Sequence, residues 1–104
     1  MKVTLLANYA PHAVKGLIQG SDREEAIKAL FESGGGKMIN MMFTRGKYDI
    51  LINGEVPDQS AIMGLAMATR ASGSLSHVVA LEELDMKDVL KAAKAAAGSY
   101  KPAG

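Results

Sequence analysis

The residues best suited to chemistry in this chain are two histidines and a group made of two tyrosines and an aspartate. His77 falls within an apolar segment. If its face looks into the core, burial would keep the imidazole neutral and available as a base at about pH 7. The alternative is a core or interface histidine that hydrogen-bonds to the backbone. His12, which follows Pro11, is interpreted either as a ligand-binding residue or as a solvated residue at a helix start.

Tyr9, Tyr48 and Asp49 form the second group. Tyr9 ends a predicted first strand and Tyr48 begins a predicted third strand. In the expected sheet these strands are antiparallel neighbours, so both residues lie toward the same end. A phenol can orient a carbonyl or phenolate substrate, and a carboxylate can accept a proton. The alternative is structural: Tyr48 packs beside the turn, and Asp49 caps it or pairs with Arg45 or Lys47.

These considerations give two sets of candidate site residues. The catalytic candidates are His77, Tyr48 and Asp49. The ligand-binding candidates are Tyr9, His12 and Arg70, since an arginine can hold a carboxylate through two hydrogen bonds. Arg70 is also compatible with a surface cation at a helix end.

Neither a metal nor a cofactor is expected. The chain has no Cys and only two His, and no third zinc ligand is identifiable. Gly34–Gly36 follows a predicted helix and precedes a predicted strand, which reverses the strand–loop–helix order of phosphate-binding loops. A histidine that ligates haem is kept as a third, weaker hypothesis.

Hydrophobic spacing predicts the elements that position these residues. Alternating segments bounded by Gly and Pro indicate strands at residues 2–9, 37–44, 48–54 and 74–82, with Met38 and Asn40 on one face of the second strand and Arg45-Gly46-Lys47 as the turn after it. Apolar residues spaced by three and four indicate helices at residues 12–18, 22–33, 58–72 and 85–97, with Ser21 or Asp22 capping the second and Asp58 the third. Leu75, His77, Val79 and Leu81 are expected to share one face of the last strand. Gly64 is interpreted as allowing close helix-to-sheet approach.

This order predicts an α+β fold of the split βαβ, ferredoxin-like type, βαββαβ plus a C-terminal helix. Residues 1–98 are expected to form one domain and 99–104 a flexible tail. Helices on one face leave the other sheet face uncovered, and a second copy packed sheet to sheet is the most economical cover. The alternative is that the C-terminal helix covers this face in a monomer.

Composition narrows the partners. The 104 residues carry a net charge of +1 with dispersed Lys and Arg, so no nucleic-acid partner is expected. No apolar segment approaches the ~20 residues of a membrane span, and the N-terminus does not resemble a signal peptide. No membrane partner is expected, and a cytoplasmic location fits.

The segment around Gly46-Lys47-Tyr48-Asp49, preceded by Gly34-Gly35 and followed by Pro57-Asp58, resembles the GYD-domain family. Tyr9, Arg23 and Gly73 also match, and the resemblance covers about residues 3 to 82. It departs at Ala10 and Ala13 and in the stretch 76–80. The resemblance implies a fold related to the dimeric α+β barrels but no agreed reaction. Related barrels include cofactor-free monooxygenases, isomerases, haem-binding enzymes and binding proteins.

Two functions therefore remain open from the sequence. The first is an oligomeric protein that binds a small apolar or aromatic molecule or serves as an assembly module. The alternative is a small cofactor-independent oxygenase or isomerase that uses a cavity between sheet and helices, with His77 as base and Tyr9, Tyr48 or Asp49 positioning the substrate.

Overall fold

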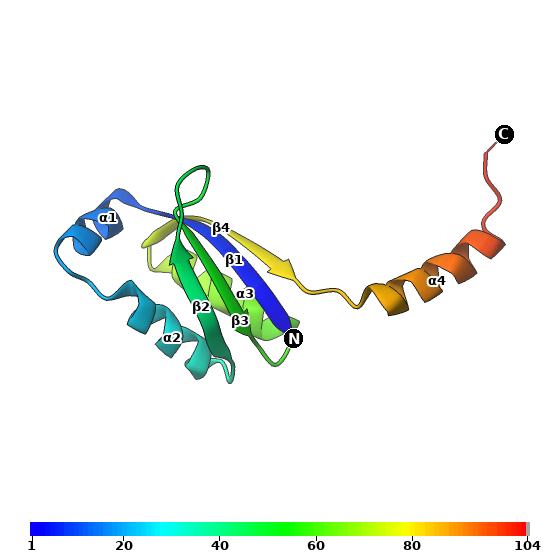
Figure 1. Cartoon of the computed structure of the whole chain (residues 1–104), viewed down its shortest axis with the longest axis horizontal. Helices are drawn as coiled ribbons and strands as arrows, with labels where there is room; N and C mark the ends of the chain where they lie inside the picture. The colour runs from blue at the N-terminus through cyan, green and yellow to red at the C-terminus, as the bar shows by residue number, and fades with distance from the viewer. Residues whose placement is uncertain (104) are drawn as a thin grey trace.

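The computed structural model describes residues 1–103 and shows a four-stranded antiparallel sheet with helices packed on one side (Figure 1). The strands are β1 (Lys2–Tyr9), β2 (Lys37–Phe43), β3 (Ile50–Glu55) and β4 (Leu75–Glu82). The helices are α1 (Pro11–Ile18), α2 (Arg23–Ser33), α3 (Gln59–Ala71) and α4 (Met86–Ser99). The strand order β2-β3-β1-β4 is that of the ferredoxin-like split βαβ fold, which confirms the predicted fold class.

Local capping explains where the two packed helices begin. Asp22 Oδ1 accepts a hydrogen bond from the Glu25 N–H at 3.0 Å, and Asp58 Oδ1 accepts one from the Ala61 N–H at 2.9 Å. Each carboxylate satisfies one of the backbone donors that the first helical turn leaves free. Both aspartates were expected as helix starts from the sequence.

The hydrophobic core lies between the sheet and the helices α2 and α3. Phe31 of α2 is fully buried and lies against Gly54 of β3, where a side chain would collide with the ring. The other buried core residues are Val3, Leu5, Ala7, Ile27, Ile50, Ile52, Val56, Ile62, Leu65 and Leu75. Gly64 has no atom within 4 Å of the position a Cβ would take, so its interpretation as a close-approach residue is wrong. The close approach is at Gly54.

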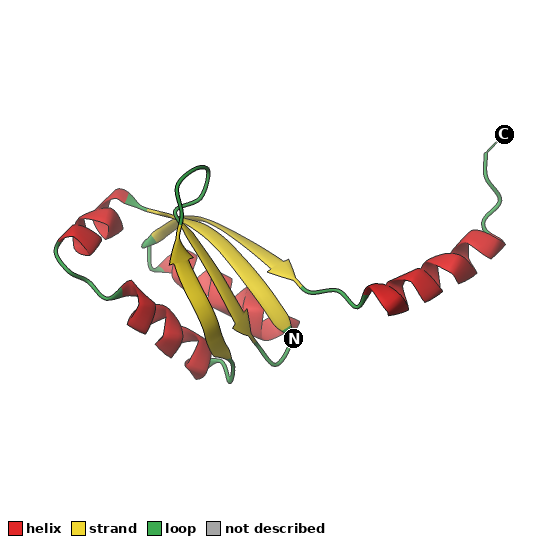
Figure 2. Ribbon diagram, viewed as in Figure 1, coloured by secondary structure: helices red, strands yellow, loops and turns green. Residues whose placement is uncertain are grey.

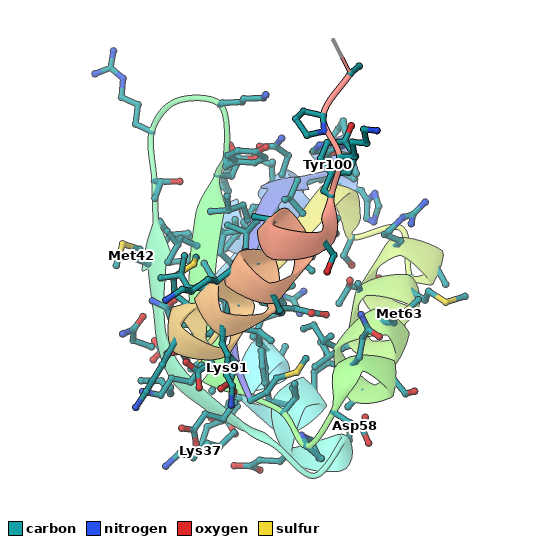
Figure 3. The ribbon with its side chains drawn as sticks, turned by 90° about the vertical axis from the view of Figure 1, so that its right-hand side faces the viewer. Lys37, Met42, Asp58, Met63, Lys91 and Tyr100 are labelled. Carbon is teal, nitrogen blue, oxygen red and sulfur yellow. The ribbon has the colours of Figure 1, made fainter. Side chains whose placement is uncertain are left out.

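No element of the structure covers the other side of the sheet, which we call the open face. Leu6, Leu51 and Val79 are half-buried there. The largest exposed apolar side chains of the open face are Ile39 at 48%, Met42 at 48% and Leu81 at 51% exposure. Figure 3 shows Met42 on this side and Met63 of α3 on the opposite side of the molecule. The predicted arrangement of helices on one face is confirmed.

A register shift in β4 changes which residues share a face. The pairing of β1 with β4 shifts between Asn8 and Tyr9, so Tyr9 pairs with Leu75 and Asn8 with His77. Directly paired residues lie on the same face of a sheet. Leu75 is therefore in the core, whereas His77 is on the open face. The prediction that these two residues share a face is wrong.

A second shift occurs in β2. The pairing with β3 shifts between Met38 and Asn40, leaving Ile39 as an extra residue. Met38 packs against the core, whereas Asn40 Oδ1 accepts a hydrogen bond from Asn53 Nδ2 on the open face at 2.9 Å. Strict alternation, which placed Met38 and Asn40 on one face, is therefore wrong for this strand.

The third strand begins later than predicted, at Ile50 instead of Tyr48. The hairpin loop is closed by Thr44, whose N–H donates to the Asp49 carbonyl oxygen at 2.8 Å and whose hydroxyl donates to the Tyr48 carbonyl oxygen. Tyr48 and Asp49 are thus loop residues held by the end of β2, and they do not belong to the ladder.

The last helix, α4, extends away from the sheet and its covering helices (Figure 2). None of the residues Met86–Ser99 is buried. The radius of gyration is 17.6 Å, whereas a compact domain of this length has about 13 Å. The alternative that α4 covers the open face of its own chain is therefore wrong. No helix within residues 1–103 has the length and apolarity needed to cross a bilayer.

Candidate functional site

A cavity of about 240 Å³ lies between α2 and α3, at the end of the sheet where β1 finishes and β4 starts. Most of its wall is apolar, formed by Ala26, Ile27, Leu30, Ala68 and Leu75. The polar lining residues are Tyr9, Arg23, Thr69, Ser72 and Ser74. The site therefore combines an apolar body with a few polar groups, as small-molecule sites do.

The hydroxyl of Tyr9 is the unusual group in this cavity. It is buried, and among residues 1–103 it has no hydrogen-bond partner. Burial raises the pKa of the Tyr9 phenol, the positive charge of Arg23 lowers it, and the carboxylate of Asp49 raises it, with a net shift upward. The phenol is therefore neutral at physiological pH and acts as a hydrogen-bond donor. A buried hydroxyl left without a partner costs about 1–3 kcal/mol.

Arg23 brings a positive charge to the same cavity. It is the first residue of α2, directly after the capping Asp22, and it is half-buried. Its charge acts on the Tyr9 phenol, as the direction of its effect on the Tyr9 pKa shows. A guanidinium and a phenol on one cavity wall can together hold an oxygen acceptor.

Two of the other polar groups already have backbone partners. The Thr69 hydroxyl donates to the Ala66 carbonyl oxygen at 2.9 Å, and the Ser72 hydroxyl donates to the Thr69 carbonyl oxygen at 2.7 Å. The Ser72 hydroxyl also accepts a bond from the Ser74 N–H at 3.2 Å. These side chains shape the end of α3, and the Tyr9 hydroxyl remains the buried polar group without a partner among residues 1–103.

Asp49 supports Tyr9 from the other side of the strand end. Its Oδ2 accepts a hydrogen bond from the Tyr9 backbone N–H at 2.9 Å, and its own N–H donates to the Ala7 carbonyl oxygen at 2.9 Å. The aspartate therefore adds two hydrogen bonds to β1 just before the first residue of β3. The expected proximity of Tyr9, Tyr48 and Asp49 at one end of the sheet is observed, and Asp49 fixes the backbone of the site.

Tyr48 and His77 lie together, but on the open face. Their rings stack with centroids 6.2 Å apart and an interplanar angle of 15°. The Lys47 ammonium lies 5.7 Å from the centroid of the Tyr48 ring. His77 is exposed and pairs with Asn8, so it does not line the cavity of Tyr9. The condition for an apolar environment around His77 is not met.

The two remaining predicted residues lie outside the cavity. His12 is exposed at the start of α1, with its ring near Gly73. Arg70 is exposed and lines a separate, more open hollow together with Ala10, Met67, Ala71, Gly73, Leu75 and Ser76. The structure therefore unites Tyr9 with Asp49, and Tyr48 with His77, and leaves His12 and Arg70 apart from both pairs.

Arg23 is the charged cavity residue that the sequence-based candidate sets omitted, and the polar residues Thr69, Ser72 and Ser74 were omitted with it. Arg23 directly follows a helix cap, and this position alone is a weak sign of a binding residue. Its closeness to Tyr9 becomes visible only in the folded chain. Within residues 1–103 there is no group of three or more His, Cys, Asp or Glu side chains with the spacing of a metal site.

The sequence matches the model of the GYD domain over residues 4–93, and the chain belongs to this family. The match runs past the expected limit at residue 82 and includes the first half of α4. Among solved structures, the chain is similar to At3g17210 from Arabidopsis thaliana, with 16% sequence identity and a TM-score of 0.42. That similarity covers 80% of this chain and 92% of the other. No curated protein matches the chain.

Proposed function

We propose that this GYD-domain protein binds a small molecule with an apolar or aromatic body and one oxygen acceptor, in the cavity between α2 and α3. The observation that carries the proposal is the buried Tyr9 hydroxyl, which has no partner within residues 1–103 and lines an otherwise largely apolar wall. Buried polar groups in folded proteins are nearly always paired, so an unpaired donor in a cavity favours a ligand or water there.

The charges of the cavity narrow the ligand. Tyr9 is a neutral donor because its pKa is raised, and Arg23 adds a fixed positive charge. A carboxylate, or a carbonyl with a partial negative charge, satisfies both groups, whereas a cation does not. The volume of about 240 Å³ is just below the ~300–1,000 Å³ of drug-sized pockets, which favours a molecule built on a single ring.

Binding is better supported than catalysis by the residues around the cavity. The described lining residues include no imidazole and no carboxylate that could act as a general base. His77, the base of the alternative oxygenase or isomerase, is on the other side of the sheet. A cytoplasmic location belongs to the same proposal, because a chain without Cys is compatible with a reducing compartment.

Benzoate is a suitable first probe, because it combines one ring with one carboxylate. Titration of the full chain with benzoate, followed by amide chemical shifts, should perturb residues of α2 and α3 around the cavity. Tyr9→Phe removes the hydroxyl and keeps the ring, and Arg23→Gln removes the charge. We expect each to weaken benzoate binding about tenfold, the factor for one hydrogen bond to a charged group.

Matched controls distinguish the cavity from general charge effects. Arg70→Gln removes a surface arginine outside the cavity and should leave benzoate affinity unchanged. Toluene has the ring without the carboxylate and should bind the wild-type chain more weakly than benzoate does. Its affinity for Tyr9→Phe should equal its affinity for the wild-type chain. The proposal fails if benzoate perturbs no cavity residue at millimolar concentration, or if Arg70→Gln weakens binding as much as Arg23→Gln.

A further inference from the structure

The apolar stripe of α4 has no partner among residues 1–103 of its own chain. Met86, Val89 and Leu90 are 53%, 41% and 60% exposed, and Ala93 continues the same side of the helix. An amphipathic helix of 14 residues is only marginally stable alone in water, because helical stability in proteins comes from packing the apolar face. The stripe therefore needs a surface on another molecule or on its own sheet.

The connection between β4 and α4 opposes folding back onto the chain's own sheet. The Glu83 N–H donates to the Lys2 carbonyl oxygen at 3.0 Å, which continues the ladder beyond β4. Asp85 already caps α4, since its Oδ1 accepts from the Lys87 N–H at 3.1 Å. Only Leu84 lies between these fixed residues, and no non-Gly residue among 1–103 has a positive φ that would give a tight reversal. The helix consequently leaves the sheet, as Figure 1 shows.

The open face has a groove that can receive apolar side chains from such a helix. Its volume is about 430 Å³, and its lining includes Ile39 and Leu81 as apolar walls, with Thr4 and Asn53 between them. Ile39 and Leu81 are 48% and 51% exposed. A helix of 14 residues is about 21 Å long, and a sheet of four strands is roughly 19 Å wide. The helix is therefore long enough to cross the open face, and the apolar stripe covers about half of that length.

Charge complementarity favours the same contact. Glu83 lines the groove together with Lys2, whereas Glu82 pairs with the core residue Val3 and therefore faces the helix side of the sheet. Lys87, Lys91 and Lys94 follow one flank of the α4 stripe, and Asp88 is the only acidic residue among Met86–Ser99. Figure 3 labels Lys91 on α4. A lysine beside the apolar stripe can therefore pair with the Glu83 carboxylate at the rim of the groove.

We propose that two copies of this chain exchange their α4 helices, so that α4 of each copy lies across the open face of the other. The exchange buries both unpartnered apolar surfaces at once and needs no change in the connection at Leu84. It makes a closed, two-fold symmetric pair, because each copy supplies one helix and one groove. The inference is independent of the cavity between α2 and α3.

Disulfide trapping tests the contact directly, because the native chain has no Cys. The double variant Ile39→Cys/Ala93→Cys is prepared unlabelled and with heavy nitrogen, and the two samples are unfolded together and refolded before oxidation. Exchange predicts a disulfide between residues 39 and 93 that joins one labelled and one unlabelled peptide. The control Ile39→Cys/Ala95→Cys places the second thiol on the opposite side of α4 and should form this bond at least tenfold more slowly.

Light scattering on single variants tests the energetics. Leu90→Lys places a charge in the stripe and should weaken the dimer about tenfold or more, as loss of an apolar anchor does. Ala95→Lys, on the other side of α4, should not. Neither substitution touches a buried residue, so both variants should keep the wild-type unfolding midpoint of the monomer. Glu83→Lys should weaken the dimer, and Lys94→Glu added to it should restore part of the loss.

Specific results would overturn the proposal. A disulfide joining only peptides of the same label would show that α4 closes onto its own sheet. A chain that is monomeric at micromolar concentration, or that uses α4 only to bind anionic vesicles, would exclude exchange. A dimer that resists Leu90→Lys and forms no bond between residues 39 and 93 would show that the copies associate without α4.

Discussion

Replacing Gly54 with alanine should destabilise the fold through a collision with Phe31. Gly54 is in the central strand β3 and pairs with Val3 on one side and Met38 on the other. A Cβ at this position would be 2.8 Å from Phe31 Cζ and 2.9 Å from Cδ1, and closer still to Cε1. Favourable carbon–carbon separations are about 3.5–4.0 Å, so the ring has to move by roughly 1 Å.

The ring has little room to move, because Phe31 is fully buried among core side chains. Overpacking of this kind costs about 1–3 kcal/mol. The gain from restricting a strand glycine in the unfolded chain is about 0.5–1 kcal/mol and offsets only part of the cost. We expect Gly54→Ala to lower the free energy of unfolding by about 2 kcal/mol, which corresponds to a fall in Tm of roughly 10 °C.

Denaturant unfolding followed by circular dichroism measures this change, with Gly64→Ala as the matched control. Gly64 is inside α3 and has no neighbour within 4 Å of its Cβ position, so the same substitution should stabilise the fold by about 0.5–1 kcal/mol. Both variants should be compared at one protein concentration, since association also stabilises the folded state. The packing argument is refuted if the two substitutions change the free energy of unfolding equally, or if Gly64→Ala destabilises the fold more than Gly54→Ala does.

A double-mutant cycle identifies the collision partner. Phe31→Leu removes ring atoms that the new Cβ would meet, at its own cost in buried area. In this background Gly54→Ala should cost at least about 1 kcal/mol less than in the wild type. If the cost is the same in both backgrounds, Phe31 is not what the alanine meets.

Three further predictions follow from the site and the helix ends. Asp49→Ala removes the acceptor of the Tyr9 N–H and should lower the free energy of unfolding by about 1–2 kcal/mol. Asp49→Asn keeps a carbonyl oxygen and should lose less than half as much stability. Equal losses for the two variants in denaturant titrations would contradict this role. The raised pKa of Tyr9 means that the folded state holds its proton above the usual pKa of 10.0; stability is therefore unaffected below about pH 10 and falls as pH rises through the folded pKa. Tyr9→Phe should remove this alkaline loss in denaturant titrations above about pH 10, and a variant that keeps the wild-type loss would exclude the assignment. Asp58→Ala removes the cap of α3 and should cost about 1 kcal/mol, with Gln59→Ala, one residue on, near neutral in the same thermal melts.

Much of the architecture follows from local chemistry. Asp22 and Asp58 cap α2 and α3 as their sequence positions predicted, and the β2–β3 hairpin turns at the expected Arg45-Gly46-Lys47 segment. These features depend on residues that are close in sequence, so a single chain contains all the information for them. The proximity of Tyr9 to Asp49 also followed, because strand order sets which strand ends meet.

The candidate site was predicted less well, for a specific geometric reason. The face assigned to His77 assumed unbroken alternation from Leu75, and one shifted residue at the β1–β4 pairing moves a side chain to the other face. Such a shift depends on the partner strand and leaves no mark in the local pattern. Arg23 was omitted because its importance comes from its position opposite Tyr9, on an element more than ten residues away.

The sequence alone determined the order of strands and helices, their caps, and the presence of an apolar sheet face that the helices leave uncovered. These features depend on spacing and on backbone chemistry within short segments. Tertiary structure decided which polar groups line the cavity with Tyr9, that a side chain at position 54 would collide with Phe31, and that α4 extends away from the sheet. Those outcomes depend on strand register and on contacts between distant segments. A register shift of one residue, or a different backbone conformation at the β4–α4 connection, changes them without changing the local sequence pattern.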